Sequence, residues 1–227
     1  MCREAWLLYG FSRTSLRGFA KVVWRPNVVG LDNVPDSGPV ILASNHLSFI
    51  DSVMIPMVAP RRVSFLAKAE YFEGTGVKGW AAREFFNGLG TVPVERSGSR
   101  DSVAVLETAL SVLDGGGAFG IYPEGTRSRD GQLYRGRTGV GWLALRSGAP
   151  VVPVGLIGTD KIQPIGSRVI RPQSFVIKFG EPMDLSDCGE ADDSRARRAA
   201  TDRIMDKIAG LTGQSRVSSY NTRPPED

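Results

Sequence analysis

The sequence has one histidine and two cysteines among its 227 residues, and it contains no long apolar run. Cys2 and Cys188 lie far apart, and a single imidazole cannot form a cluster of soft ligands, so we expect neither a disulfide framework nor a metal site. No stretch reaches the ~18 apolar residues of a bilayer-spanning helix. Basic residues interrupt the first 26 positions, so no secretory signal peptide is predicted. A reducing compartment fits this composition.

Positive charge is concentrated at the N-terminus, although the net charge of the chain is only +4. Residues 1–26 carry five basic groups and one acidic group (+4), whereas residues 181–227 carry seven basic and ten acidic groups (−3). A helix here would place a basic stripe beside an apolar face, which suits either an anionic membrane surface or packing on the domain. No basic and aromatic interleaving continues along the chain, so nucleic acid is not an expected partner. Four basic residues form the stripe: Arg13, Arg17, Lys21 and Arg25.

Short apolar runs alternate with helical patterns through the middle of the chain. This alternation predicts an α/β fold: a single domain with a largely parallel central sheet flanked by helices, preceded by an N-terminal amphipathic helical segment. The predicted organisation is a membrane-interface helix over 1–25, one domain over 26–212 and a disordered tail over 213–227. The expected strands are 39–44, 63–68, 91–95, 118–123, 151–157 and 175–180, and the expected helices lie near 48–58, 77–87, 101–114, 137–147 and 190–210.

The only histidine, His46, has a carboxylate five residues later, Asp51, in "SNHLSFID". Residues five apart on one helix differ in direction by about 140°, so the two side chains meet only if His46 precedes the helix. The strand 39–44 followed by a turn allows this, and Asp51 then orients the imidazole for proton transfer at the carboxyl end of the strand. A histidine that only caps the turn is the simpler alternative. No G-x-S-x-G nucleophile motif occurs, so a base that activates a substrate hydroxyl is favoured over a hydrolase triad.

Two predicted strands each end in a segment with an arginine. "GTVPVERSG" (90–98) presents Arg96, and "GIYPEGTRSRDG" (120–131) presents Arg127. A guanidinium fork suits phosphate, and convergence of both arginines with His46 would make an anion site beside a base. Each arginine alone fits a surface ion pair equally well.

A glycine pattern offers an alternative from another class of protein. "GTGVKG", Gly74–Gly79, matches the G-x-G-x-x-G of a dinucleotide-binding turn, which would make the chain an NAD-binding oxidoreductase. The fingerprint requires its first glycine to follow a strand directly, whereas residues 69–73 separate Gly74 from the expected strand 63–68. This reading also leaves His46 and the arginines without a shared purpose.

Four blocks in order resemble the glycerolipid acyltransferases, the family of 1-acylglycerol-3-phosphate O-acyltransferases, over residues 25–180. "NHLSFID" is similar to the family's first block, a histidine and an aspartate separated by four residues, and implies catalytic His46 and Asp51. "GTVPVER" and "YPEGTRS" resemble the second and third blocks, and "VVPVGLIG" resembles the fourth, a mostly structural block. The resemblance implies that Arg96 binds the acceptor phosphate, and the further candidate substrate-binding residues are Glu124, Gly125, Thr126, Arg127, Lys68 and Asn45.

The resemblance implies a phospholipid-biosynthesis enzyme that moves a fatty acyl group from acyl-CoA or acyl-carrier protein to lysophosphatidic acid, giving phosphatidic acid. It implies neither a metal nor any other cofactor, and it places the protein as a peripheral protein at the cytoplasmic face of a membrane. Glycerol-3-phosphate or another lysolipid is an alternative acceptor. A phospholipid-binding module without chemistry is a further alternative, which predicts vesicle binding without thiol release.

Overall fold

The structure is a computed structural model that describes residues 23–68, 74–76, 79–80, 92–94, 99–167 and 169–222. The predicted amphipathic segment lies almost entirely outside these residues, as does most of the predicted helix 77–87. None of the helices within the described ranges is long and apolar enough to cross a membrane.

The centre of the fold is a six-stranded sheet in the order β1-β8-β7-β2-β6-β3. All neighbouring strands run parallel except β7 and β8, which pair antiparallel. A separate parallel pair joins β4 (Leu66–Lys68) to β5 (Val92–Val94). The six strands are β1 (Asn27–Val29), β2 (Val40–Ser44), β3 (Val63–Ser64), β6 (Ala118–Ile121), β7 (Val151–Ile157) and β8 (Val176–Phe179).

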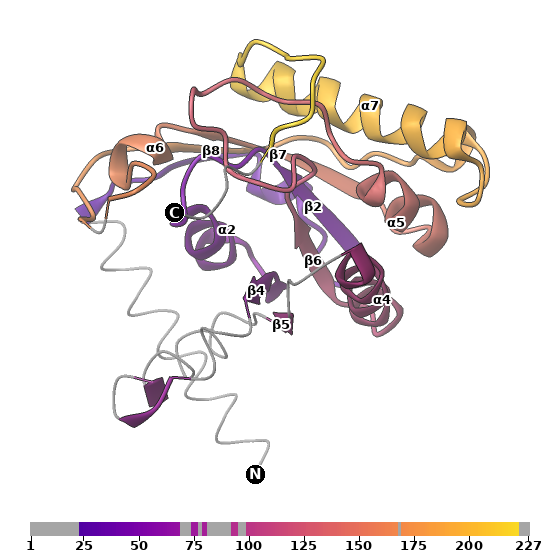
Figure 1. Ribbon diagram of the computed structural model, residues 1–227, viewed down its shortest axis with the longest axis horizontal. Helices are drawn as coiled ribbons and strands as arrows, with labels where there is room; N and C mark the ends of the chain where they lie inside the picture. The colour runs from indigo at the N-terminus through magenta and orange to yellow at the C-terminus, as the bar shows by residue number, and fades with distance from the viewer. Residues whose placement is uncertain are drawn as a thin grey trace.

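Helices cover both faces of the sheet, as Figure 1 shows. One face packs against α2 (Asp51–Val58), and the other packs against three helices. The central strand β2 is buried at every position because it has helices on both sides, which is why it reads as an unbroken apolar run. The three helices on the second face are α4 (Ser99–Asp114), α5 (Gly139–Ser147) and α7 (Ser194–Thr212), and shorter helices lie at η1 (Leu31–Asn33), α6 (Thr159–Ile162) and η3 (Ser186–Cys188).

The predicted α/β class, with a largely parallel sheet flanked by helices, is confirmed. The expected strand 63–68 is divided into β3 and β4, which belong to different sheets. β1 was not predicted, because this three-residue edge strand is largely exposed and has no apolar run to identify it. The helix expected over 101–114 begins two residues earlier, at Ser99 of α4.

The sheet brings three loops to one edge, the one formed by the carboxyl ends of its parallel strands. β2 lies between β6 and β7 and runs parallel to both, so the segments that follow the carboxyl ends of these three strands emerge on the same side of the domain. These segments hold His46 after β2, Glu124 after β6 and α6 after β7. Parallel α/β sheets bind their ligands at this edge.

Candidate active site

His46 and Asp51 are in direct contact. The imidazole Nδ1 lies 2.9 Å from the Asp51 Oδ2, the carboxylate is fully buried, and 15% of the His46 side chain is exposed. The contact forms as predicted, because α2 begins at Asp51 and His46 lies in the turn before it. The carboxylate therefore fixes the tautomer with hydrogen on Nδ1 and leaves Nε2 for a substrate.

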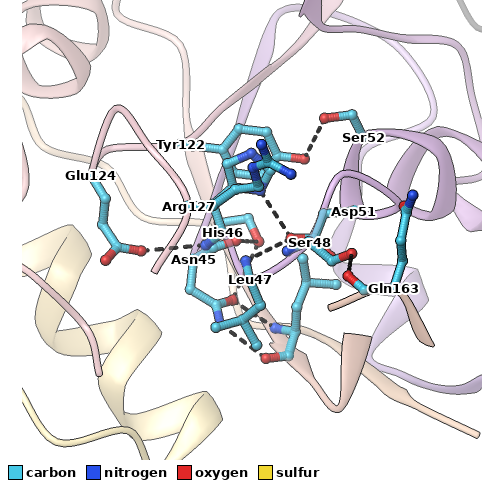
Figure 2. Close-up of polar contacts among 12 residues, drawn as sticks. Asn45, His46, Leu47, Ser48, Asp51, Ser52, Tyr122, Glu124, Arg127 and Gln163 are labelled. Atoms are coloured by element: carbon cyan, nitrogen blue, oxygen red, sulfur yellow. Dashed lines mark hydrogen bonds and ion pairs between the residues drawn. The ribbon is translucent and has the colours of Figure 1, made fainter. Parts of the chain in front are cut away.

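The same carboxylate oxygen also organises the turn. Leu47 N–H donates to Asp51 Oδ2 at 2.7 Å, and Ser48 N–H donates to it at 2.8 Å. Three donors on one oxygen hold the imidazole and the turn backbone in a fixed relation, as Figure 2 shows. Asp51 therefore lies at the start of α2, and its side chain reaches back to His46, as its position in the sequence predicted.

Tyr122 stacks on the His46 ring. The two ring centroids are 3.8 Å apart, and the planes differ by 9°. The phenol oxygen is 3.0 Å from the Ser52 Oγ, which ties the segment after β6 to α2. Burial, together with the nearby Asp51 charge, raises the Tyr122 pKa well above 10, so the phenol stays neutral. Sequence reasoning did not single out Tyr122 as a site residue, and its place directly after the β6 strand was the only available signal.

Glu124 supports the site from a buried position. Its Oε1 accepts the His46 N–H at 3.3 Å, and its Oε2 accepts the Tyr134 N–H at 2.9 Å. Burial raises the pKa of this carboxyl from 4.5 to about 7, and the two backbone N–H groups only partly oppose that shift. The side chain is fully buried, so its contacts are those of a positioning residue and differ from the predicted substrate-binding role.

Arg127 is carried to the His46 turn by the loop after β6. Ser128 N–H donates to the His46 carbonyl at 2.8 Å, and the Arg127 guanidinium overlaps the stacked rings in the view of Figure 2. Gly125 closes the turn that presents it, with its N–H bonded to the Tyr122 carbonyl and a φ of 78°. Gly125 is exposed, and Thr126 and Arg127 are half-buried, so this part of the predicted set is accessible to a ligand.

Asn45 lies beside His46 but faces inward. Its amide nitrogen donates to the Leu156 carbonyl at 2.9 Å, its oxygen accepts the Leu156 N–H at 2.8 Å, and the side chain is fully buried. These contacts lock β2 to β7 and differ from the substrate-binding role predicted for Asn45. The sequence gave no indication that Gln214, 169 residues away, also bonds this amide at 2.8 Å.

Residues 214–222 lie against the site, and here the structure differs from the predicted disordered tail. Gln214 donates to the Gly131 carbonyl at 2.7 Å, and Asn221 donates to the Arg127 carbonyl at 3.1 Å. The guanidinium groups of Arg135 and Arg137 lie over the ring of Tyr220. The segment lacks apolar periodicity because polar and cation–π contacts hold it, and such contacts leave no periodic pattern.

Two predicted site residues, Arg96 and Lys68, are not placed relative to His46. Arg96 lies outside the described residues. Lys68 is described only as the last residue of β4, paired with Val94 of β5. Within the described part of the chain, no three His, Cys, Asp or Glu side chains gather as metal ligands.

The dinucleotide alternative lacks its required geometry. β4 ends at Lys68, and residues 69–73, which lie outside the described ranges, come between it and Gly74. Gly74 and Gly79 instead approach each other closely, since a Cβ on Gly79 would lie 1.9 Å from the Gly74 carbonyl oxygen.

The chain is similar in sequence to several known acyltransferases. The chloroplastic 1-acyl-sn-glycerol-3-phosphate acyltransferase of Brassica napus is 35% identical over 148 residues, which cover 65% of this chain and 41% of the relative. The 1-acyl-sn-glycerol-3-phosphate acyltransferase of Bacillus subtilis is 24% identical over 206 residues, which cover 90% of this chain and 96% of that protein. The chain spans about two fifths of the length of the chloroplastic relatives it matches.

The fold has a counterpart among solved structures. The crystal structure of the 1-acyl-sn-glycerophosphate (LPA) acyltransferase PlsC from Thermotoga maritima superposes with a TM-score of 0.70 at 25% identity, covering 93% of this chain and 84% of that one. A family model described as Acyltransferase matches residues 25–157, more than half of the 227 residues. The chain therefore belongs to the acyltransferase family.

Proposed function

We propose that the protein transfers a fatty acyl group from an acyl thioester to the free hydroxyl of lysophosphatidic acid, forming phosphatidic acid. The observation that carries the proposal is the 2.9 Å contact between His46 and Asp51 at the ligand-binding edge of the sheet. The chain's family supports the reaction class, and relatives named 1-acyl-sn-glycerol-3-phosphate acyltransferases support the acceptor.

In the proposed reaction, His46 is the general base. Its Nε2 takes the proton of the acceptor hydroxyl while the oxygen attacks the thioester carbonyl carbon, and Asp51 stabilises the resulting imidazolium. The C–O bond forms, the C–S bond breaks, and the proton on Nε2 passes to the departing thiolate. The products are an ester and a free thiol, so the atoms and charges balance without an acyl-enzyme, a metal or any other cofactor.

The acceptor phosphate would be held by the arginines. Arg127 is carried to His46 by the loop after β6, and its guanidinium can bond phosphate bidentately. We assign Arg96 to the same phosphate from its place in the sequence, with Thr126 and the Gly125 backbone as additional donors. Lys68 is a further candidate, assigned likewise from its place in the sequence.

The acyl donor is acyl-CoA or acyl-carrier protein, and both release a free thiol. A thiol-release assay with palmitoyl-CoA and a panel of lysophosphatidic acid, glycerol-3-phosphate and lysophosphatidylcholine tests the proposed reaction. We expect release that depends on lysophosphatidic acid. Release with glycerol-3-phosphate alone would transfer the assignment to that acceptor. Vesicle binding without thiol release would indicate a lipid-binding module, and NAD binding without release would indicate an oxidoreductase.

We also propose that residues 1–25 hold the protein peripherally at the cytoplasmic face of a membrane, where acceptor and product reside. Each basic group near anionic headgroups contributes about 1 kcal/mol, so the four-residue stripe would contribute roughly 4 kcal/mol at low salt. Deleting residues 1–25 should weaken sedimentation with phosphatidylglycerol vesicles more than it lowers the unfolding free energy, and salt should weaken wild-type binding. Equal binding by the shortened chain would refute this role.

A further inference from the structure

We propose that a basic cavity next to His46 binds the phosphate-bearing pantetheine end of the acyl donor. This inference rests on the proposed acyl transfer, because it names the place of the second substrate. The cavity has a volume of about 630 Å³, and three cationic side chains line it: Arg129, Lys161 and Arg171.

The cavity adjoins the proposed base through two chain neighbours. Leu47, which also lines it, follows His46, and Ser128 follows Arg127. The backbone bond from Ser128 to the His46 carbonyl, 2.8 Å long, joins these two walls. In the proposal, the donor fills the cavity and its thioester extends past Leu47 toward the imidazole.

A main-chain bond holds two of the three cations close together. Lys161 lies on α6, whose first turn follows Gly158, and Arg171 N–H donates to the Ile162 carbonyl at 2.8 Å. Arg129 lines the same cavity from the loop after β6. α6 and the connection to β8 are drawn in orange in Figure 1.

The segment that follows α6 and lines the cavity is fixed to the turn after His46. Ser48 Oγ donates to the Gln163 carbonyl at 2.7 Å, which ties the start of the segment 163–173 to the turn after His46 (Figure 2). Pro164 and Ile165 of this segment line the cavity. The basic wall is thus positioned by the same turn that carries the imidazole.

The charge of the cavity favours an anion. Three cations face one carboxylate, Asp160, giving a net charge of +2. Among the residues that the structure describes, Arg129, Lys161 and Arg171 take part in no side-chain ion pair. Their charges therefore remain available to a ligand.

The size of the cavity favours the acyl donor over the acceptor phosphate as its ligand. Ligand pockets typically measure roughly 300–1,000 Å³, so this cavity suits a molecule much larger than a single phosphate group. Its mixture of cations with Leu47, Pro164 and Ile165 suits a pantetheine arm ending in phosphate. CoA and acyl-carrier protein share that arm, so the shared group is the proposed ligand and the experiment distinguishes its two sources.

The test is a double variant, Lys161→Gln/Arg171→Gln, with Lys207→Gln/Arg195→Gln as the matched control. The control residues are exposed on α7, outside the cavity, and lose the same charge. Steady-state thiol release is measured with palmitoyl-CoA, palmitoyl-carrier protein and S-palmitoyl-pantetheine, which has no phosphate. We expect the cavity variant to raise the donor KM about tenfold for a phosphate-bearing donor, equivalent to about 1.4 kcal/mol.

The KM for S-palmitoyl-pantetheine and the KM for lysophosphatidic acid should stay unchanged. A rise with palmitoyl-CoA identifies CoA as the source, and a rise only with the carrier-protein donor identifies that protein. An unchanged KM for both donors, or a rise for lysophosphatidic acid instead, would overturn the inference while leaving the acyltransferase reaction intact.

Calorimetry separates the two proposals. CoA and holo-carrier protein are titrated into wild type, the cavity variant and the control. These titrations measure binding and do not need turnover. We expect affinity for at least one of them to fall about tenfold in the cavity variant alone. If the wild type released no thiol, the proposed reaction would fail, and this titration would still decide whether the cavity binds the donor end.

Discussion

The rings of His46 and Tyr122 lie face to face, with centroids 3.8 Å apart and planes 9° from parallel. The stack covers one face of the imidazole, while the Asp51 carboxylate holds its Nδ1. In the proposed reaction His46 takes a proton, and an aromatic face stabilises a neighbouring cation, so the stack would support that step. Tyr122 therefore contacts the proposed base from a direction different from that of Asp51.

Two replacements of Tyr122 distinguish the contribution of its ring from that of its hydroxyl. Tyr122→Leu removes the stack and should lower kcat about tenfold, since a cation–π contact contributes about 0.5–2 kcal/mol. Tyr122→Phe keeps the stack and loses only the bond to Ser52, so it should retain most of the activity. Measurement of kcat for both variants at saturating substrates checks this. Equal losses in the two variants would assign the effect to the Ser52 bond instead.

Replacing the carboxylate tests tautomer control. Asp51→Asn keeps an oxygen for the Leu47 and Ser48 N–H groups but removes the charge that stabilises the imidazolium in the proposed reaction. We expect kcat to fall at least about 10²-fold with little change in either KM. Loss of charge on these hydrogen bonds should also lower the unfolding free energy by about 1–2 kcal/mol. A rise in KM at unchanged kcat would contradict a role in the chemistry.

Glu124 should make stability depend on pH. Its pKa is about 7 in the folded protein and 4.5 when exposed, so the folded state binds the proton more tightly between these values. The unfolding free energy should therefore fall as pH rises from about 4.5 to 7, by at most about 3 kcal/mol from this group. Urea unfolding of wild type and Glu124→Gln at pH 5 and pH 8 measures the difference. Identical pH responses in the two proteins would show that Glu124 does not titrate there.

Local sequence determined the turn that holds His46 and Asp51. The apolar run of β2, the polar turn and the start of α2 together required His46 to precede the helix and Asp51 to reach back, and the structure has this contact. Parallel strands then brought the loop carrying Glu124 to the same edge. These features were predictable because each depends on residues close in sequence, or on the general rule for parallel sheets.

Long-range contacts were not predictable in this way. Gln214 bonds Asn45 across 169 residues, and no local pattern indicates such a pair. The inward orientation of Asn45 and Glu124 depends on which β7 and loop backbone groups lie opposite them, which only the folded chain determines. The strand division at Phe65 likewise follows from pairing with two different partners rather than from composition.

Thiol release by His46→Ala in the presence of lysophosphatidic acid, measured beside wild type, tests directly whether His46 is the base. We expect release to fall at least about 10²-fold, because the substrate hydroxyl loses its base, while the unfolding free energy and the affinity for CoA stay close to wild type. Turnover at the wild-type rate by the folded variant would contradict this role.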